Sequence, residues 1–323
     1  MAPMFSIITP TYNRSAFIKE TVESVKSQNF PSIEHIVVDG GSTDETLDIL
    51  REYPQLRIIS EPDEGMYDAI NKGLSIAQGT IVGILNSDDI YEPDIFGAIA
   101  QQFEANPDLE AVAGGTAVFS DTSGKRQILR TRRWIEPEEL WFRLASYPST
   151  NAWFFRKTVF ERYGRFNPKY RYAGDREFLL RAALAGMKYA PFKQTVCNYR
   201  AHPDSVTFAA KDIPALLLSP IRVQVLKEAM ELSENFLGLA ALPDEARLHL
   251  RRYHTRRAYA LADLALEYGK FDLALFAITR GVKQNPLSIF SFLRRQVKKR
   301  LVKVGKFVRN TFFSLVSFVP LFL

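Results

Sequence analysis

Short apolar, β-branched runs alternate with helix-like stretches through the first ninety residues, and this alternation constrains the fold more than any other feature. The expected strands cover residues 5–9, 35–39, 57–60 and 80–85. Stretches with helical spacing or helix-start residues lie between them. Strand–helix alternation at this spacing is typical of a mostly parallel sheet with right-handed crossovers and helices on its faces. The sequence therefore predicts an α/β fold.

Polar or glycine-rich segments follow all four expected strands. They cover residues 9–13, 39–44, 61–65 and 86–89, and three of them contain carboxylates. Open parallel sheets bind ligands at the carboxyl ends of their strands. We therefore expect a ligand site at this edge of the sheet.

Two adjacent carboxylates, Asp88 and Asp89, come directly after the fourth and most apolar run. Adjacent carboxylates repel each other unless a positive charge lies close by, and oxygen ligands of this kind suit Mg²⁺ or Mn²⁺. A divalent cation that also contacts phosphates would satisfy this need. A turn followed by the start of a helix near Pro93 explains the same residues equally well.

Three further positions each allow two interpretations. Asp39, before Gly40 and Gly41, could accept a hydrogen bond from a base or a ribose, or the glycines could simply form a tight turn. Asp175 opens an apolar helix and could act as a general base or as a partner of the helix dipole. His202 follows a strand-like run and could be a ligand or a structural residue.

The charge distribution limits the partners of the chain. The net charge is +6, but residues 273–323 contain ten Lys or Arg and no Asp or Glu, so the rest of the chain is net acidic. A nucleic-acid-binding body should carry its basic face through the folded domain, so we expect no nucleic-acid partner. The single cysteine, Cys197, excludes an internal disulfide and favours a reducing compartment. The start of the chain does not look like a secretory signal peptide.

The last third of the chain is expected to be helical. Residues 246–268 and 271–283 have the spacing of a helical hairpin that turns at Gly269. Residues 290–308 mix apolar and basic positions in the pattern of an interfacial helix on an anionic membrane, and an interface with another subunit is the alternative. Residues 311–323 are uncharged and too short to span a bilayer. The expected parts are an α/β ligand-binding domain over 1–210, a helical region over 211–285 and a membrane-associating tail over 286–323.

Taken together and in order, three runs resemble the inverting family 2 glycosyltransferases, which have a GT-A fold. They are SIITPTYNR at residues 6–14, VVDGGSTD at 37–44 and LNSDD at 85–89. A fourth run, EPDEGMYDAINKG at 61–73, is similar to a subgroup of bacterial enzymes that build exopolysaccharide, O-antigen and colanic-acid-type units. The resemblance covers about residues 4–208 and implies a GT-A sheet followed by a helical region.

The resemblance implies roles for the matching residues. Asp175 would be the catalytic base, Asp89 would hold Mn²⁺ or Mg²⁺ on the donor diphosphate, and His202 would complete the metal or phosphate shell. Thr9, Tyr12 and Asp39 would line the base pocket, and Asp88 would approach the ribose. Asn86 replaces the first Asp of the usual Asp-x-Asp motif, so the division of work between Asp88 and Asp89 stays open. The residues implied for nucleotide-sugar binding are Thr9, Pro10, Tyr12, Asp39, Gly40, Gly41, Asp63, Met66, Asn71, Lys72, Asn86, Ser87 and Asp88.

The leading hypothesis is a metal-dependent hexosyltransferase that moves a sugar from a nucleoside-diphosphate sugar to a hydroxyl of a glycan or lipid-linked acceptor, in cell-surface polysaccharide synthesis at the cytoplasmic membrane face. No Gln-x-x-Arg-Trp run follows Asp175, which favours single additions over processive synthesis. One alternative is a catalytically silent binding module at the membrane. Another is a sugar nucleotidyltransferase, although residues 10–14 lack the glycines typical of that class. A homo-oligomer stays open.

Overall fold

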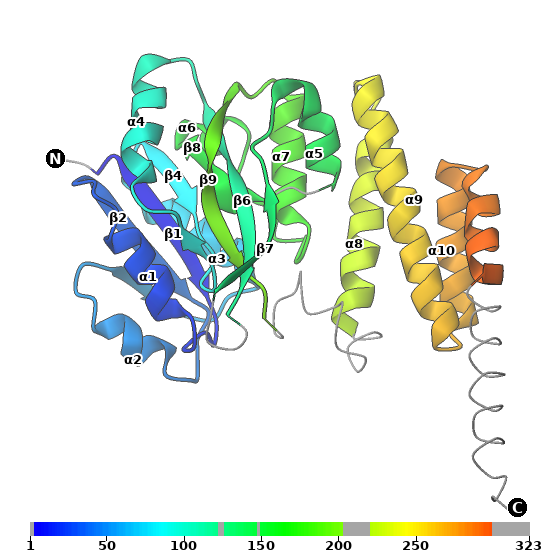
Figure 1. Ribbon diagram of the computed structural model, residues 1–323, viewed down its shortest axis with the longest axis horizontal. Coiled ribbons are helices and arrows are strands. Elements are labelled where there is room, and N and C mark those ends of the chain that lie inside the picture. The colour runs from blue at the N-terminus through cyan, green and yellow to red at the C-terminus, as the bar shows by residue number, and fades with distance from the viewer. Residues whose placement is uncertain (1–2, 122–125, 147–148, 203–219, 299–323) are drawn as a thin grey trace, which may run out of the picture.

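A computed structural model describes residues 3–121, 126–146, 149–202 and 220–298 of the 323-residue chain. These residues form one nine-stranded sheet with helices around it (Figure 1). The strands are β1 (Phe5–Thr11), β2 (Ile33–Asp39), β3 (Arg57–Ser60), β4 (Ile81–Ile84), β5 (Ile90–Tyr91), β6 (Ala111–Ser120), β7 (Gln127–Arg132), β8 (Trp153–Arg156) and β9 (Tyr189–Arg200). The α-helices are α1 (Ile18–Lys26), α2 (Thr46–Arg51), α3 (Met66–Ile76), α4 (Ile95–Ala105), α5 (Leu140–Ser146), α6 (Thr158–Arg162), α7 (Gly174–Leu184), α8 (Pro220–Leu237), α9 (Asp244–Glu267) and α10 (Phe271–Gln284).

The strand order is β3-β2-β1-β4-β8-β6-β9-β5, with β7 paired to β6. The first four strands in this order are parallel, as the sequence predicts. Strand β8 then enters antiparallel between β4 and β6, so the other half of the sheet is mixed. The expected α/β class is confirmed. The antiparallel strands β7 and β8 come from later parts of the chain, where no strand–helix alternation predicts them.

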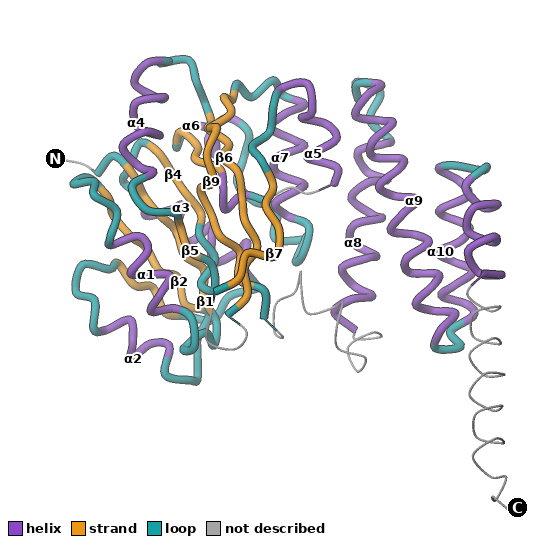
Figure 2. Tube along the Cα trace, viewed as in Figure 1, coloured by secondary structure: helices purple, strands orange, loops and turns teal. Residues whose placement is uncertain are grey.

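Helices cover both faces of the sheet (Figure 2). Successive side chains of a strand point to opposite faces, so neighbouring residues of β1 enter different cores. Ile7 packs in a core with Val25 of α1 and Phe96 of α4, whereas Ile8 packs with Leu74 of α3 and with residues of α7. Burial on both faces explains why β1 is buried along its whole length.

The C-terminal helices α8, α9 and α10 lie side by side beyond α5 and α7 (Figure 1). The chain reverses between α9 and α10 at Gly269, whose φ of 67° is in the left-handed region that favours glycine. Helices α8 and α9 share a core with the α/β part, because Leu232 and Leu250 pack in the same cluster as Phe178 of α7. The helical region is therefore built onto the sheet layer.

The expected domain boundary at 210/211 lies outside the described residues, as does the tail from residue 299 onward. The first part of that tail is described, and residues 288–298 form a helix there. The expected division into three parts stays a prediction. Within the described residues, no helix is long and apolar enough to cross a membrane.

Candidate active site

The loops after β1 and β2 are tied together at the carboxyl edge of the sheet. The Asn13 N–H donates to Ser42 Oγ at 2.8 Å, and the Thr43 N–H donates to Asn13 Oδ1 at 2.8 Å. Asn13 has a φ of 51°, a left-handed conformation that asparagine tolerates better than most residues. These bonds make the two loops one wall of the site.

Asp39 supports this wall from inside. Its side chain is completely buried, and Oδ2 accepts hydrogen bonds from Gly41 N at 3.1 Å, Ser42 N at 3.0 Å and Ser60 Oγ at 2.8 Å. The Ser42 hydroxyl also donates to Oδ1. The carboxylate therefore fixes the loop that a base would contact. Direct contact between Asp39 and a nucleotide base stays a prediction.

The loop after β3 approaches the loop after β2 through a glycine. A Cβ on Gly40 would lie 2.5 Å from Asp63 Oδ2, so only glycine leaves room for this carboxylate. Asp63 Oδ1 accepts the Gly65 N–H at 2.8 Å, and Lys72 Nζ donates to the Pro62 carbonyl at 2.8 Å. Lys72 also forms an ion pair with Glu61 at 2.9 Å. Gly40, Asp63 and Lys72 thus shape this loop and bring it against the neighbouring one.

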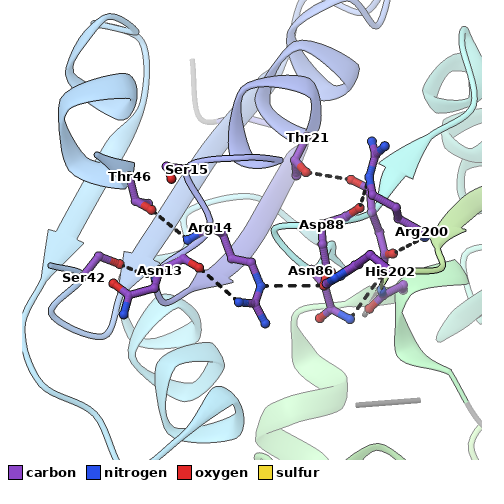
Figure 3. A network of polar contacts seen from close by, with 12 residues as sticks. Asn13, Arg14, Ser15, Thr21, Ser42, Thr46, Asn86, Asp88, Arg200 and His202 are labelled. Atoms are coloured by element: carbon purple, nitrogen blue, oxygen red, sulfur yellow. Dashed lines mark hydrogen bonds and ion pairs between the residues drawn. The ribbon is translucent and has the colours of Figure 1, made fainter. Parts of the chain in front are cut away.

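Asp88 is the carboxylate that the described structure leaves open. Its Oδ2 lies 3.0 Å from His202 Nε2 and 3.8 Å from Arg14 Nε, while its other oxygen has no hydrogen-bond partner among the described residues (Figure 3). Arg14 comes from the loop after β1, and His202 follows β9. Three segments far apart in sequence therefore meet at one carboxylate.

Asp89, by contrast, is buried and occupied. Oδ2 accepts hydrogen bonds from Asn151 Nδ2 at 2.7 Å and from Asn86 Nδ2 at 3.4 Å, and Oδ1 accepts the Arg200 N–H at 3.0 Å. Burial, followed by the neighbouring Asp88 charge, raises the pKa of the Asp89 carboxyl well above its usual range. Asp89 therefore joins the loop after β4 to β9 and to the segment before β8, and its direct contact with a metal stays a prediction.

The side chains around Asp88 fit a divalent cation bound in part by a substrate. Among the described residues, no group of three or more His, Cys, Asp or Glu side chains could hold a metal by itself. Mg²⁺ and similar cations are often held by one or two protein ligands together with substrate phosphates and water. Asp88 and His202 supply one oxygen and one nitrogen close together, and the buried His202 Nδ1 has no hydrogen-bond partner among the described residues.

Arg200 stabilises the loop that carries Asp88. Its guanidinium forms ion pairs with Glu20 of α1 and with Asp121 after β6, and its Nε donates to the Asp88 carbonyl at 3.1 Å. The Arg200 side chain is only 6% exposed, whereas the two partner carboxylates are 43% and 39% exposed. These contacts fix the backbone of Asp88 and the end of β9.

Asp175 lies in the first turn of α7, half-buried, where the start of α3 meets the start of α7. Burial raises the pKa of the Asp175 carboxyl, and the Arg176 charge and hydrogen bonds from the Arg176 N–H and the Tyr67 hydroxyl offset this only in part. A Cβ on Gly174 would lie 2.7 Å from the Tyr67 ring, and that ring is stacked on Phe166. Glycine at position 174 therefore lets the tyrosine reach the carboxylate.

The C-terminal helices support the segment that carries Asp175. The buried Glu228 of α8 accepts the Tyr172 N–H at 2.8 Å. The buried Arg176 donates to Tyr253 of α9 at 2.5 Å, with its guanidinium 4.2 Å from the ring centroid. The segment over residues 172–176 therefore contacts the helical region at Tyr172 and at Arg176.

The charges of Asp89 and Asp175 both influence the same side chain, Tyr199. Burial raises the pKa of the Tyr199 phenol well above its usual range, and the charges of both Asp89 and Asp175 raise it further. Tyr199 belongs to β9, whose end carries His202. Both carboxylates are therefore within electrostatic range of Tyr199, and their action on one bound substrate stays a prediction.

The remaining expected residues divide by exposure. Tyr12 and Met66 are exposed, at 56% and 37%, so they can meet a ligand. Thr9 is fully buried and contacts His35 Nε2 at 2.9 Å, and Pro10 and Ser87 are buried as well. Asn71 holds Phe166 through both of its amide atoms, at 2.8 and 3.1 Å. For these buried residues, ligand contact stays a prediction. Trp153 is 2% exposed and belongs to the core.

Sequence reasoning gave no role to four residues that the structure brings to the site: Arg14, Tyr67, Asn151 and Arg200. Arg14 and Tyr67 stand inside the motif runs, so their position was a usable signal. Asn151 reaches Asp89 across 62 residues of sequence, and no local pattern indicates that contact.

Comparisons with known proteins identify the class of enzyme to which this chain belongs. Residues 6–164 match the model of the family described as "Glycosyl transferase family 2". A PGL/p-HBAD biosynthesis glycosyltransferase of Mycobacterium tuberculosis H37Rv is 33% identical over 189 residues, which is 56% of this chain and 70% of that protein. The chain therefore belongs to glycosyltransferase family 2 and is a transferase.

Another relative is the glycosyltransferase EpsJ of Bacillus subtilis 168, described as uncharacterized, which is 27% identical over 269 residues. The match covers 78% of this chain and 76% of EpsJ. Among solved structures, S. aureus TarS 1–349 in complex with UDP-GlcNAc has a TM-score of 0.58 at 16% identity and covers 88% of this chain and 89% of that one. The mannosyltransferase PcManGT of Pyrobaculum calidifontis, in complex with GDP-Man and Mn²⁺, has a TM-score of 0.56 at 19% identity, with 96% and 88% covered. The fold is thus the GT-A fold that the motifs predict.

Proposed function

We propose that the protein is a metal-dependent, inverting glycosyltransferase that adds single sugars from a nucleoside-diphosphate sugar to a hydroxyl of a glycan or lipid-linked acceptor. The observation that carries the proposal is the contact between Asp88 and His202 after β4 and β9, and Asp175, a half-buried carboxyl of raised pKa at the start of α7, is the candidate base. A raised pKa makes a carboxylate a better proton acceptor near neutral pH.

Asp175 is the proposed general base. As the acceptor hydroxyl attacks the anomeric carbon, a new C–O bond forms on the face opposite to the leaving group, and the hydroxyl proton passes to the Asp175 carboxylate. The anomeric C–O bond to the diphosphate breaks in the same displacement, which inverts the configuration. The Tyr67 hydroxyl and the Arg176 N–H hold the carboxylate in place for this step.

Asp88 and His202 are the proposed protein ligands of Mn²⁺ or Mg²⁺, a refinement of the expectation for Asp89. Asp89 positions its neighbour through its three hydrogen bonds. The cation would supply positive charge for the diphosphate that departs. Arg14, 3.8 Å from Asp88, places a second positive charge at the same point.

The donor is proposed to lie along the loops after β1, β2 and β3. The exposed Tyr12 offers a ring for stacking on a base, and Gly40 and Asp63 form the narrow contact between two of these loops. The titles of the similar structures name UDP-GlcNAc for TarS and GDP-Man with Mn²⁺ for PcManGT. These names support a nucleoside-diphosphate sugar and a cation here and leave the base open.

Cell-surface polysaccharide synthesis at the cytoplasmic membrane face is the proposed setting. The related glycosyltransferase of M. tuberculosis is named for PGL/p-HBAD biosynthesis, which supports a biosynthetic role for this chain. In the helix over 288–298, Phe290, Leu293 and Val297 are 69%, 51% and 58% exposed and lie at the spacing of one helix face. Basic residues accompany them, as an interfacial helix on anionic lipid requires. The exposed stripe supports peripheral membrane binding.

The proposal is tested by replacing the base alone. Asp175→Asn should reduce sugar transfer by at least about a hundredfold, because general-base catalysis contributes on the order of 10²–10⁴, while nucleotide affinity stays at the wild-type value. Asp108→Asn, a change at an exposed carboxylate, is the control. Full transfer by Asp175→Asn would refute the assignment of the base.

A further inference from the structure

A polar cavity lies between α5 and α9, and neither Asp88 nor His202 lines it. Its volume is about 170 Å³, and it is lined by Ser146, Tyr253, Arg256 and Arg257. One water molecule needs only about 10–15 Å³ of such space, so the cavity can hold a polyatomic ion. None of the residues assigned to donor binding lines this cavity.

Every polar group that lines the cavity can donate a hydrogen bond. Arg256 and Arg257 have no carboxylate partner among the described residues, and the Arg257 guanidinium lies 4.9 Å from the centroid of the Tyr253 ring. The Tyr253 hydroxyl accepts from Arg176 Nη1 at 2.5 Å, which leaves its own hydrogen for another acceptor. The Arg256 Nε donates to the Arg252 carbonyl at 3.3 Å, but among the described residues no carboxylate neutralises either guanidinium group.

The buried side chain of Ser146 is an independent observation that points to a ligand. Its side chain is 7% exposed, and its Oγ has no hydrogen-bond partner among the described residues. A buried hydroxyl without a partner is unfavourable, and such groups in native proteins call for an explanation. An anion in the cavity would accept hydrogen bonds from this hydroxyl and from both arginines.

The cavity lies on the catalytic-base side of the site. Arg176, which bonds to Tyr253, directly follows Asp175 in the first turn of α7. Arg176 also donates to the Leu144 carbonyl in α5 at 3.2 Å, so it joins both helices that border the cavity. The acceptor must approach Asp175, whereas the donor diphosphate belongs at Asp88.

We propose that this cavity binds a phosphate group of the acceptor and that the acceptor is a phosphate-bearing molecule such as a lipid-linked diphosphate sugar. The acceptor role rests on the proposed function, but the anion site does not. Guanidinium groups bind phosphate through charge-assisted, often bidentate, hydrogen bonds, and the two adjacent arginines with two hydroxyls provide that chemistry. Phosphate bound here would anchor the acceptor beside the base.

The test measures binding of two probes, inorganic pyrophosphate and farnesyl diphosphate, to the full chain by calorimetry with EDTA present. The double variant Arg256→Gln/Arg257→Gln should bind at least about tenfold more weakly than wild type, since each lost charge-assisted bond is worth a factor of this order. Arg251→Gln is the matched control, because residue 251 lies on the opposite side of α9 from Tyr253. Asp88→Asn should bind both probes as wild type does.

A third variant separates binding from folding. Ser146→Ala removes a hydroxyl that has no partner, so it should leave the thermal stability unchanged or slightly higher and should weaken binding of the probes. Lower stability with unchanged binding would show that the serine is structural and would count against the proposal.

The outcomes identify the source of the phosphate. Tighter binding of farnesyl diphosphate than of pyrophosphate assigns the cavity to a lipid-linked acceptor, and equal binding assigns it to a soluble phosphate. Binding that the double variant retains, or no binding of either probe at millimolar concentration, overturns the proposal. If arginine-dependent binding is present while no sugar transfer is ever found, the anion site stands and the proposed function fails.

Discussion

Gly174 gives a direct test of how the segment that carries Asp175 is packed. A Cβ at this position would lie 2.7 Å from the ring of Tyr67, which is 3% exposed and stacked on Phe166 with ring centroids 5.5 Å apart. The ring has little room to withdraw. Overpacking of this kind costs about 1–3 kcal/mol, and alanine regains about 0.5–1 kcal/mol of helix preference over glycine. We therefore expect Gly174→Ala to lower the free energy of unfolding by about 0.5–2 kcal/mol.

The matched control is Gly97→Ala in the first turn of α4, where a Cβ would meet nothing within 4 Å. That change should raise the stability by about 0.5–1 kcal/mol, because only the helix preference acts. Urea unfolding of both variants measures the difference. Sugar transfer should fall in Gly174→Ala alone, since a displaced Tyr67 no longer orients Asp175. Equal stability and activity of the two variants would refute the packing argument.

Three further predictions follow from titration and exposure. Burial lowers the pKa of His35 to about 3, so this histidine is neutral in the fold but binds a proton on unfolding below about pH 6.5. Stability should therefore fall by about 1.4 kcal/mol per pH unit between about pH 6 and pH 4 relative to His35→Gln, and parallel pH profiles would contradict this. Because burial raises the pKa of Asp175, the acid limb of the kcat/KM profile should lie above about pH 3.9, the usual pKa of Asp. An acid limb at or below that pH would show that the pKa of the base is not raised. Replacing Phe290, Leu293 and Val297 by Ser should reduce the fraction of protein that sediments with anionic vesicles by about tenfold. Ile128→Ser, a change at an exposed residue of β7, should leave this fraction unchanged. Equal effects of the two changes would exclude a specific membrane-binding face.

Local sequence determined much of the fold in its first third. Residues 5–9 and 35–39 are strands because β-branched runs between helices suit a sheet that is buried on both faces. Strand β8 was not foreseen as the antiparallel insertion next to β4, since that pairing joins Val82 to Phe155 across more than seventy residues. Pairings at such separation depend on tertiary packing and leave no local pattern.

In the candidate site, too, contacts between residues far apart in sequence leave no local pattern. The motif run over 85–89 identified Asp88 and Asp89, and the start of an apolar helix identified Asp175, but neither pattern could tell which carboxylates are exposed. Burial and hydrogen bonding decide this, because Asp89 accepts from Asn151 and Arg200, which lie 62 and 111 residues away. Only the folded chain shows that Asp88, with His202, is the accessible member of the acidic pair.

The central claim, a nucleoside-diphosphate-sugar transferase that uses a cation at Asp88, is tested most directly by nucleotide binding. UDP, GDP, dTDP, CMP and ADP are added to the wild type and to Asp88→Asn, each with and without Mn²⁺ or Mg²⁺, and the thermal unfolding midpoint is measured. A ligand at a hundred times its dissociation constant stabilises by about 2.7 kcal/mol, which is readily seen. The account predicts that one nucleotide raises the midpoint of the wild type only when the cation is present and that Asp88→Asn loses this shift. No shift with any nucleotide, or a metal-dependent shift that Asp88→Asn keeps in full, would contradict it.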